Sequence, residues 1–283
     1  MGDGDTNRGL TRPSVAGRAR ATFARGADGV VRLADLEQRD PLKILFPDPL
    51  EELQPVAVLV NTGGGIVGGD SHTIDVEVGA GAAALVTAQA AEKIYRSWGP
   101  PARVTNSLRV GAGGRLEWLA QEAILFDGAK LDRRLAVDLA EGAELLAGEI
   151  LVFGRRARGE TMRTGALRDR WSIRRGAKRV WDDALILDAL DEALLDKPAL
   201  FAGARATATL VCACPDGARG LDIARAALEG AANAGAGLVN GLLIARLLDS
   251  DPARLRRDYA KLWCALRAGL WSLPGRLPRL WHV

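Results

Sequence analysis

The residues that most resemble a ligand-binding motif are the glycines of the stretch NTGGGIVGGD, residues 61–70. Gly63, Gly65 and Gly68 match the pattern G-x-G-x-x-G, which binds the pyrophosphate of a dinucleotide when the glycines connect a strand to the N-terminus of a helix. The residues that follow instead alternate between apolar and polar side chains over 72–78, and this period of two predicts a strand. We therefore interpret the glycines as a loop or bulge that lets two chain segments approach closely.

Carboxylates inside apolar segments are the next residues that could do chemistry. Glu117, Glu122 and Asp127 interrupt the run RLEWLAQEAILFDGAK, and Glu149 lies within LLAGEILVFG. A carboxylate in an apolar strand must be paired or must face water, because burying an isolated charge is costly. One interpretation is a buried ion pair with an arginine such as Arg155. The other is a water-filled internal passage lined by acidic groups.

Histidine and cysteine are too few to support a recognised catalytic or zinc arrangement. The histidines are His72 and His282, and neither has a carboxylate at a motif spacing. Cys212 and Cys214 would share one face of a strand, but no second pair or nearby histidine completes a tetrahedral metal site. We therefore expect core cysteines and no catalytic residues, and the sequence leaves the roles of His72 and this cysteine pair open.

Period-two segments dominate most of the chain and predict the strands that must position these residues. Such segments are HTIDVEV (72–78), TNSLRV (105–110) and RRLAVDL (133–139). Gly81, Gly113 and Gly142 each follow an apolar strand residue by three positions and recur at near-constant intervals. Because glycine supplies the positive φ of a tight turn, the repeat indicates stacked hairpins in a β-solenoid-like body, with an ordinary sandwich as the alternative.

The C-terminal part has a different pattern. ATATLVC (206–212) and LLIARLL (242–248) are strand candidates. Asp216 is placed to cap one helix, and Asp251 followed by Pro252 begins another. We therefore predict a mainly β fold, with an elongated, stacked β-hairpin or β-solenoid-like body and a small C-terminal α/β part that contains two helices.

The expected organisation has three segments, of which the last two form one continuous domain. Residues 1–20 are interpreted as a flexible N-terminal tail, residues 21–205 as the β-rich body, and residues 206–283 as a strand-helix-strand-helix part packed on that body. The basic stretch RDRWSIRRGAKR (168–179) has apolar residues at strand spacing, and we interpret it as a solvated edge strand.

Charge and cysteine content restrict the class of protein. The 283 residues carry a net charge of +3 at pH 7 without a dense basic run, which argues against nucleic-acid binding. Three cysteines cannot build a disulfide framework, and this is typical of a reducing compartment. We find neither a secretory signal nor an apolar window long enough to span a bilayer, so we expect a cytoplasmic protein without a membrane partner.

Six short motifs occur together in the order and at the approximate intervals found in one family. They are GGGIVGGD (63–70), AEKIYRS (91–97), LEWLAQE (116–122), FDGA (126–129), GEILVFGR (148–155) and LPRLW (277–281). On these motifs, over nearly all of residues 20–283, the chain resembles the urease accessory proteins of the UreD/UreH family. It departs from the family at VNTGGG, where a His-Pro-Pro lead into the glycines is frequent, and at Ala120, where proline is common.

The resemblance implies a maturation chaperone and not an enzyme. Proteins of this family bind UreF and, through it, the GTPase UreG, in a complex that dimerises through UreF, and they dock on apo-urease and help pass nickel into its active site. The resemblance implies no tightly bound cofactor, with nickel(II) only in transit, and it makes Asp70, Glu122, Asp127 and Glu149 the candidate residues of a transient nickel passage. Carboxylate and water ligands suit a courier, because they hold this ion less tightly than imidazole or thiolate clusters do.

Other motif residues receive structural interpretations. We expect Tyr95 to be packed and Arg96 to be paired, and the C-terminal LPGRLPRLW to be either docked on the body or a partner surface. Two other functions are alternatives. A nucleotide-dependent oxidoreductase requires a helix over residues 70–80, and a carbohydrate-binding or purely structural β-solenoid requires exposed aromatic platforms.

Overall fold

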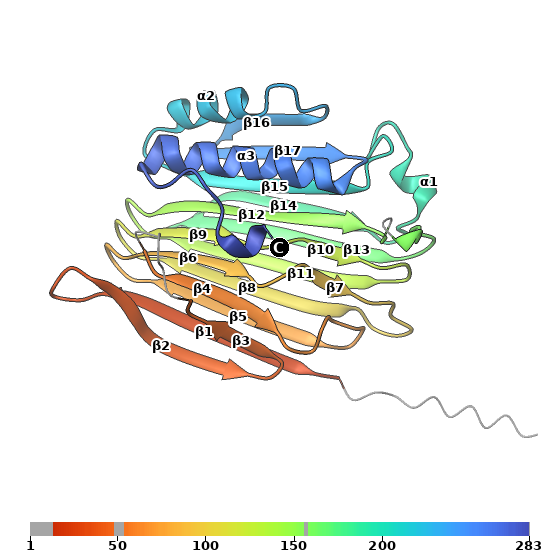
Figure 1. The fold of residues 1–283 in the computed structure, drawn as a ribbon, viewed down its shortest axis with the longest axis horizontal. Coiled ribbons are helices and arrows are strands. Elements are labelled where there is room, and N and C mark those ends of the chain that lie inside the picture. Colours follow the sequence, from red (N-terminus) through yellow and green to blue (C-terminus); the bar gives the residue numbers. More distant parts are fainter. Residues whose placement is uncertain (1–13, 48–53, 156–157, 283) are drawn as a thin grey trace, which may run out of the picture.

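The computed structural model describes residues 14–47, 54–155 and 158–282, and these residues form two β-sheets stacked face to face, with helices over one outer face (Figure 1). Apolar side chains from both sheets share one core, in which Val76 and Leu108 of one sheet lie in the same cluster as Val86 and Leu116 of the other. The interior between the sheets is therefore the place where buried polar groups must find partners.

One sheet has seven strands in the order β14-β13-β11-β8-β5-β1-β2. Its strands are β1 (Ala16–Arg25), β2 (Val31–Arg39), β5 (Ser71–Val78), β8 (Ala102–Val110), β11 (Lys130–Leu139), β13 (Ala166–Arg175) and β14 (Lys178–Leu187). Neighbours from β1 to β13 run parallel, and the antiparallel strands β2 and β14 form the two edges.

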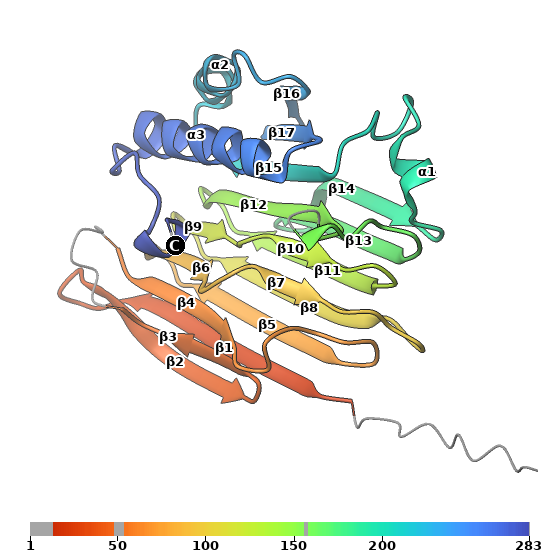
Figure 2. The ribbon, with the colours of Figure 1, turned by 45° about the vertical axis from the view of Figure 1, so that its right-hand side comes forward.

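The other sheet has ten strands, with the main order β16-β17-β15-β12-β9-β6-β4-β3 and with β10 and β7 joined beside β12. Its strands are β3 (Leu42–Leu45), β4 (Val56–Asn61), β6 (Ala83–Ala88), β7 (Glu92–Ile94), β9 (Arg115–Leu119), β10 (Ala123–Leu125), β12 (Glu144–Phe153), β15 (Ala206–Ala213), β16 (Ala234–Val239) and β17 (Leu242–Asp249). In both views the chain advances from β2 and β3 at one end of the stack to β14 and β17 at the other (Figures 1 and 2).

Glycine turns carry the chain from one sheet to the other. Gly81, Gly113 and Gly142 have φ values of 62°, 61° and 65°, and they lie between β5 and β6, β8 and β9, and β11 and β12. The turns stack, since Gly81 N donates to Ala112 O at 2.9 Å and Gly113 N donates to Glu141 O at 3.1 Å. The predicted solenoid-like stack is confirmed, with the difference that the two strands of each unit pair with neighbouring units and not with each other, because each buries its apolar side against the opposite sheet.

Helices cover the outer face of the ten-stranded sheet near β15 and β17 (Figure 2). They are α2 (Gly217–Ala227) and α3 (Pro252–Trp271), and a short helix α1 (Glu192–Leu195) precedes β15. As predicted, the Asp216 and Asp251 carboxylates cap α2 and α3, each accepting a backbone N–H at 2.9 Å. Tyr259 and Trp263 lie on the buried stripe of α3. Among the described residues, none of the helices combines the length and the apolar composition that a bilayer span requires.

Three expectations need correction. Strand β1 begins at Ala16, so the flexible tail predicted to reach residue 20 is wrong from residue 16 onward, and residues 1–13 lie outside the described residues. The stretch 168–179 is not an edge strand, because most of it belongs to β13, which is paired on both sides, with its arginines on the outer face. The C-terminal part contains an additional strand, β16, whose residues AGAGLV carry a weak strand signal because they include two glycines.

Candidate functional site

A cavity of about 210 Å³ lies between the two sheets. The seven-stranded sheet contributes His72 from β5, Asn106 from β8 and Arg133 from β11 to its walls. The ten-stranded sheet contributes Trp118 from β9 and Glu149 from β12. The core of the sandwich therefore contains a space with polar and ionisable walls.

Strand alternation explains why these polar side chains point into the sandwich. On β11, Arg133 lies on the same side as the buried Leu131 and Leu135. On β13, Asp169 lies on the same side as the buried Trp171. Because the two strands pair with Arg133 opposite Asp169, the sheet itself places the guanidinium beside the carboxylate.

Arg133, Asp169 and Glu149 form a buried ionic triad. Arg133 Nε and Nη2 each donate to the Asp169 carboxylate at 2.8 Å, and Nη2 also lies 3.0 Å from Glu149 Oε2. Burial raises the pKa of Glu149 to about 7, against the charge of Arg133, which lowers it. Burial lowers the pKa of Arg133, but the two carboxylates raise it by more than burial lowers it, so the guanidinium stays charged. The buried pair expected for Glu149 exists with Arg133 as its partner, whereas Arg155 pairs with Glu160.

The cavity opens to the surface beside a second carboxylate, Glu92 on β7, where the exposed Gln89 and Lys93 are among the lining residues. Asn61 Nδ2 donates to the two Glu92 carboxylate oxygens at 3.0 and 3.1 Å, and burial raises the pKa of Glu92 to about 7. Burial also lowers the pKa of the His72 imidazole. Near neutral pH the walls therefore hold partly ionised carboxylates and a neutral imidazole, which are groups that bind divalent cations.

A surface hollow of about 380 Å³ adjoins this opening, since Gln89 and Gln121 line both spaces. Glu122 lines the hollow and pairs with Arg256 of α3. Arg256 Nη2 in turn donates to the carbonyl oxygen of Trp281 at 2.9 Å, and Trp281 is buried. Of the two interpretations of the C-terminal segment, the structure supports docking on the body.

At its other end the cavity is followed by a small pocket of about 30 Å³, and Glu149 and Arg133 line both spaces. Asp169 lines the small pocket, together with the ion pair of Asp183 and Arg246, whose atoms Oδ2 and Nη2 are 2.6 Å apart. Arg246 is exposed. We call the surface hollow, the cavity and the small pocket the interior route, because each shares lining residues with the next.

The other two carboxylates proposed from the sequence are not lining residues of the interior route. Asp70 is buried, and its Oδ1 accepts from the backbone N–H of Val15 at 2.8 Å. Asp127 pairs with Arg96 and accepts from the backbone N–H of Arg163 at 2.9 Å. Burial raises the pKa of Asp127, but these hydrogen bonds lower it by more, so the pKa lies below its ordinary value. The structure thus brings Glu122 and Glu149 to one route and gives Asp70 and Asp127 backbone partners elsewhere.

The glycine loop is confirmed as a close approach of two segments. A Cβ at Gly65, where φ is 146°, would lie 2.3 Å from the Tyr95 ring, and a Cβ at Gly68 would lie 1.8 Å from Ser97 Oγ. Tyr95 is packed there, and its hydroxyl donates to the carbonyl oxygen of Gly64 at 3.0 Å. The following residues form β5 and not the helix that a dinucleotide site requires.

Thiols and clustered ligands do not build a closed metal site in the part of the chain that the structure describes. There, no group of three or more His, Cys, Asp or Glu side chains could hold a metal ion. Cys212 is buried in the core and Cys214 is half-buried beside it, both as free thiols. The carboxylates of the interior route are instead spread singly along it, with Glu122 in the surface hollow, Glu92 at the opening and Glu149 at the inner end.

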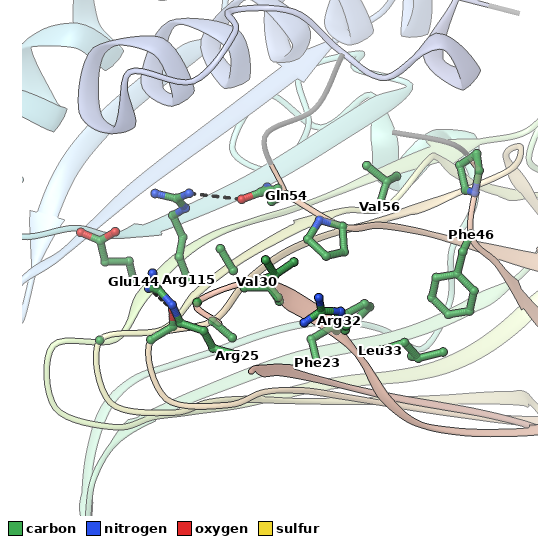
Figure 3. A pocket seen from close by; sticks show the side chains of 18 residues that line it. Phe23, Arg25, Val30, Arg32, Leu33, Phe46, Gln54, Val56, Arg115 and Glu144 are labelled. Carbon is green, nitrogen blue, oxygen red and sulfur yellow. Dashed lines mark hydrogen bonds between the residues drawn. The ribbon is translucent and has the colours of Figure 1, made fainter. Parts of the chain in front are cut away.

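A separate groove of about 970 Å³ lies beside the glycine turns (Figure 3), and it shares no lining residue with the interior route. Arg25 and Arg115 line one side of it, and Leu33 and Phe46 lie at the other (Figure 3). Apolar side chains are uncovered at this end of the stack, and we call them the apolar patch. They are Val30, Leu33, Leu36, Leu45 and Phe46. Uncovered apolar surface of this kind is typical of proteins that contact a partner.

Sequence reasoning missed Asn106, Arg133, Asp169 and Glu92 as residues of the site. The signal for two of them was present, because Arg133 and Asp169 occupy positions of their strands that otherwise hold buried apolar residues. The basic residues around Asp169 concealed it, since they made the whole segment read as solvated. Glu92 and Asn106 have no such signal in the sequence, and only the stacking of the sheets brings them to one cavity.

Comparison with known proteins places the chain in a family. A family model described as UreD urease accessory protein matches residues 15–282. The chain is 45% identical over 263 residues to the urease accessory protein UreD of Methylobacterium sp. (strain 4-46), with 91% of each chain covered. It is 45% identical over 279 residues to UreD 2 of Methylorubrum populi, which covers 98% of this chain and 90% of the relative. The resemblance read from the six motifs is thereby confirmed, and the chain belongs to the UreD family of urease accessory proteins.

Proposed function

We propose that the protein is a non-catalytic scaffold of urease maturation that hands nickel(II) to apo-urease in the cytoplasm. In this proposal it binds UreF, and through it the GTPase UreG, in a complex that dimerises through UreF and docks on apo-urease. Nickel enters the surface hollow and leaves at the far end of the interior route. Family membership supports the role in urease maturation.

The observation that carries the nickel part of the proposal is the interior route itself. Carboxylates occur along it at successive positions, from Glu122 in the surface hollow to Glu92 at the opening and Glu149 at the inner end. Oxygen ligands spaced in this way can pass a divalent cation onward without holding it in a closed shell.

The pKa values of the lining groups suit transfer near neutral pH. Burial raises the pKa of Glu92 and of Glu149 to about 7 in each case. Such a carboxylate loses its proton when a cation binds and takes it up again when the cation leaves. Neither state then leaves an isolated charge in the interior, which would be costly.

The proposal is tested by replacing Glu149 with Gln, which removes the charge and keeps the size of the side chain. Urease activation is measured in the reconstituted complex with nickel, GTP and bicarbonate, and assembly of the complex is measured by size-exclusion chromatography. We expect activation to fall about tenfold or more, with assembly unchanged.

Glu117 supplies the matched control. Like Glu149 it belongs to the ten-stranded sheet, but it is fully buried on the opposite face, where its Oε2 lies 2.9 Å from Nε of Arg267. It does not line the interior route. Replacing Glu117 by Gln should change the free energy of unfolding, whereas urease activation per folded complex should stay as in the wild type. Full activation by the Glu149→Gln complex would remove Glu149 from the route.

The two alternative functions have less support. The oxidoreductase requires a helix after the glycines, and β5 is there instead. A carbohydrate-binding solenoid requires a platform of exposed aromatic rings, whereas among the described tryptophans Trp98 alone is strongly exposed, at 87%.

A further inference from the structure

Arg133 and Glu149 form the partition between two spaces of the interior route. They are the two residues that line both the 210 Å³ cavity and the 30 Å³ pocket. Both side chains are buried, and so is that of Asp169. Anything that moves from one space to the other must therefore pass this ionic triad.

The geometry of the triad places one nitrogen atom between two carboxylates. Nη2 of Arg133 lies 2.8 Å from Asp169 Oδ2 and 3.0 Å from Glu149 Oε2. A single cation at the position of that nitrogen would lie between the two carboxylates. The other contact of the guanidinium, from Nε to Asp169 Oδ1 at 2.8 Å, does not involve Glu149. Arg133 can therefore leave Glu149 and still keep a charged partner.

An unsatisfied oxygen atom beside the triad also points to a ligand. Asn106 is 4% exposed and lines the cavity, and its Nδ2 donates to Glu149 Oε1 at 3.4 Å. Its Oδ1 is buried and has no hydrogen-bond partner among the described residues. A buried acceptor without a partner is costly and rare. Amide oxygens are ligands of divalent cations, so Asn106 Oδ1 could also bind a cation that Glu149 holds.

We infer that the Arg133 guanidinium holds the place of a divalent cation between Glu149 and Asp169, and that nickel in transit displaces it from Glu149. The identity of the cation rests on the proposed function. Arg133 then keeps the nickel affinity of this position low, so that the ion passes instead of remaining bound.

Charge explains why the two cations exclude each other. With Arg133 present, the two ionised carboxylates and one guanidinium sum to a single negative charge, and without it the carboxylates present two. A guanidinium repels a dication that lies a few ångström away in a protein interior. This repulsion lowers the binding constant of the dication by more than a factor of about ten. The cavity has room for several water molecules, which complete the coordination that the protein oxygens leave open.

The experiment measures nickel binding to the full chain, without urease. NiCl₂ is titrated into wild type and Arg133→Met by isothermal calorimetry, and nickel-dependent changes in the thermal midpoint are recorded in parallel. We expect Arg133→Met to bind one nickel ion per chain at least about tenfold more tightly than wild type. Arg133→Lys keeps the positive charge and should bind as wild type does. Should Arg133→Met fail to fold, Arg133→Gln provides the same test.

Two controls separate this effect from the loss of any buried arginine. Arg267→Met removes a fully buried guanidinium that pairs with Glu117 on the other face of the sheet, and it should gain no nickel affinity. Adding Glu149→Gln to Arg133→Met should abolish the gain. Unchanged nickel affinity in both Arg133→Met and Arg133→Gln, or an equal gain in Arg267→Met, would overturn the inference.

The outcomes also distinguish this inference from the proposed function. If the Arg133 variants gain no site while Glu149→Gln still abolishes urease activation, the displaceable arginine is refuted and the nickel route stands. If Arg133→Met gains the site while Glu149→Gln activates urease normally, the cation position is real and the route through it is refuted.

Discussion

Replacing Glu92 by Gln tests how the walls of the cavity are charged. Folding raises the pKa of Glu92 from 4.5 to about 7, chiefly through burial. The side chain of Gln keeps an oxygen that accepts from Asn61 Nδ2, which lies 3.0 Å from Glu92 Oε1 in the wild type. The substitution therefore removes the ionisation and keeps one of the two contacts with Asn61 Nδ2.

The sign and size of the effect follow from linkage. Below about pH 4.5 Glu92 is protonated in the folded and unfolded states, so the substitution has little effect there. As the pH rises through about 7 the wild type loses the stability of the protonated form, and Glu92→Gln does not. The full shift corresponds to about 3 kcal/mol. Because Glu92 is only partly buried, solvent screening reduces the expected gain of the variant to about 1–2 kcal/mol above pH 7.5.

The assay is urea unfolding followed by tryptophan fluorescence at submicromolar protein, at several pH values between about 5 and 8.5. The quantity of interest is the difference in free energy of unfolding between variant and wild type, since titration of other groups is common to both. Glu229→Gln, which removes an exposed carboxylate, controls for the loss of one negative charge. A difference that is constant with pH, or a variant less stable than wild type at high pH, would refute the reasoning.

Three further substitutions, one of them with a matched control, probe the packing and the apolar patch. Gly68→Ala places a Cβ 1.8 Å from Ser97 Oγ and should lower the free energy of unfolding by about 1–3 kcal/mol, whereas Gly99→Ala meets no atom within 4 Å and should be nearly neutral in urea unfolding. Trp281→Ala removes a buried ring and should lower the free energy of unfolding by about 3–5 kcal/mol; a loss below 1 kcal/mol in the same assay would contradict docking of the C-terminus. We expect the isolated chain to aggregate through its apolar patch, so Leu33→Lys should lower its light scattering, and unchanged scattering would contradict a role of the patch.

Local patterns predicted much of the fold. Alternation over residues 72–78 identified β5, and the aspartates at 216 and 251 located the starts of α2 and α3. The glycine repeat predicted the stacked architecture because a positive φ is a property of single residues. These signals succeed because strand period, helix caps and tight turns depend on neighbours in the chain.

Prediction failed where the partner was distant. For Glu149 the sequence offered either a passage or a buried pair with an arginine, of which Arg155 on the same segment was the example, and the structure supplies the pair with Arg133 of the opposite sheet. Family resemblance alone suggested Asp70 and Asp127 as passage residues; in the structure each accepts a backbone N–H, from Val15 and from Arg163, and neither lines the interior route. Which of several carboxylates meets which arginine depends on sheet stacking, which no single segment encodes.

By itself the sequence indicated a β-rich stack in which the glycine loop leads into a strand and not into a helix, and its motifs identified the UreD family. These conclusions rest on short-range order, which a string of residues records directly. Only the tertiary structure decided that Arg133, Asp169 and Glu149 meet in one partition and that Glu92 and Asn106 border the same cavity. The physical reason is that these contacts are made between strands and across the two sheets, so they exist only once the sandwich has closed and removed the groups from water.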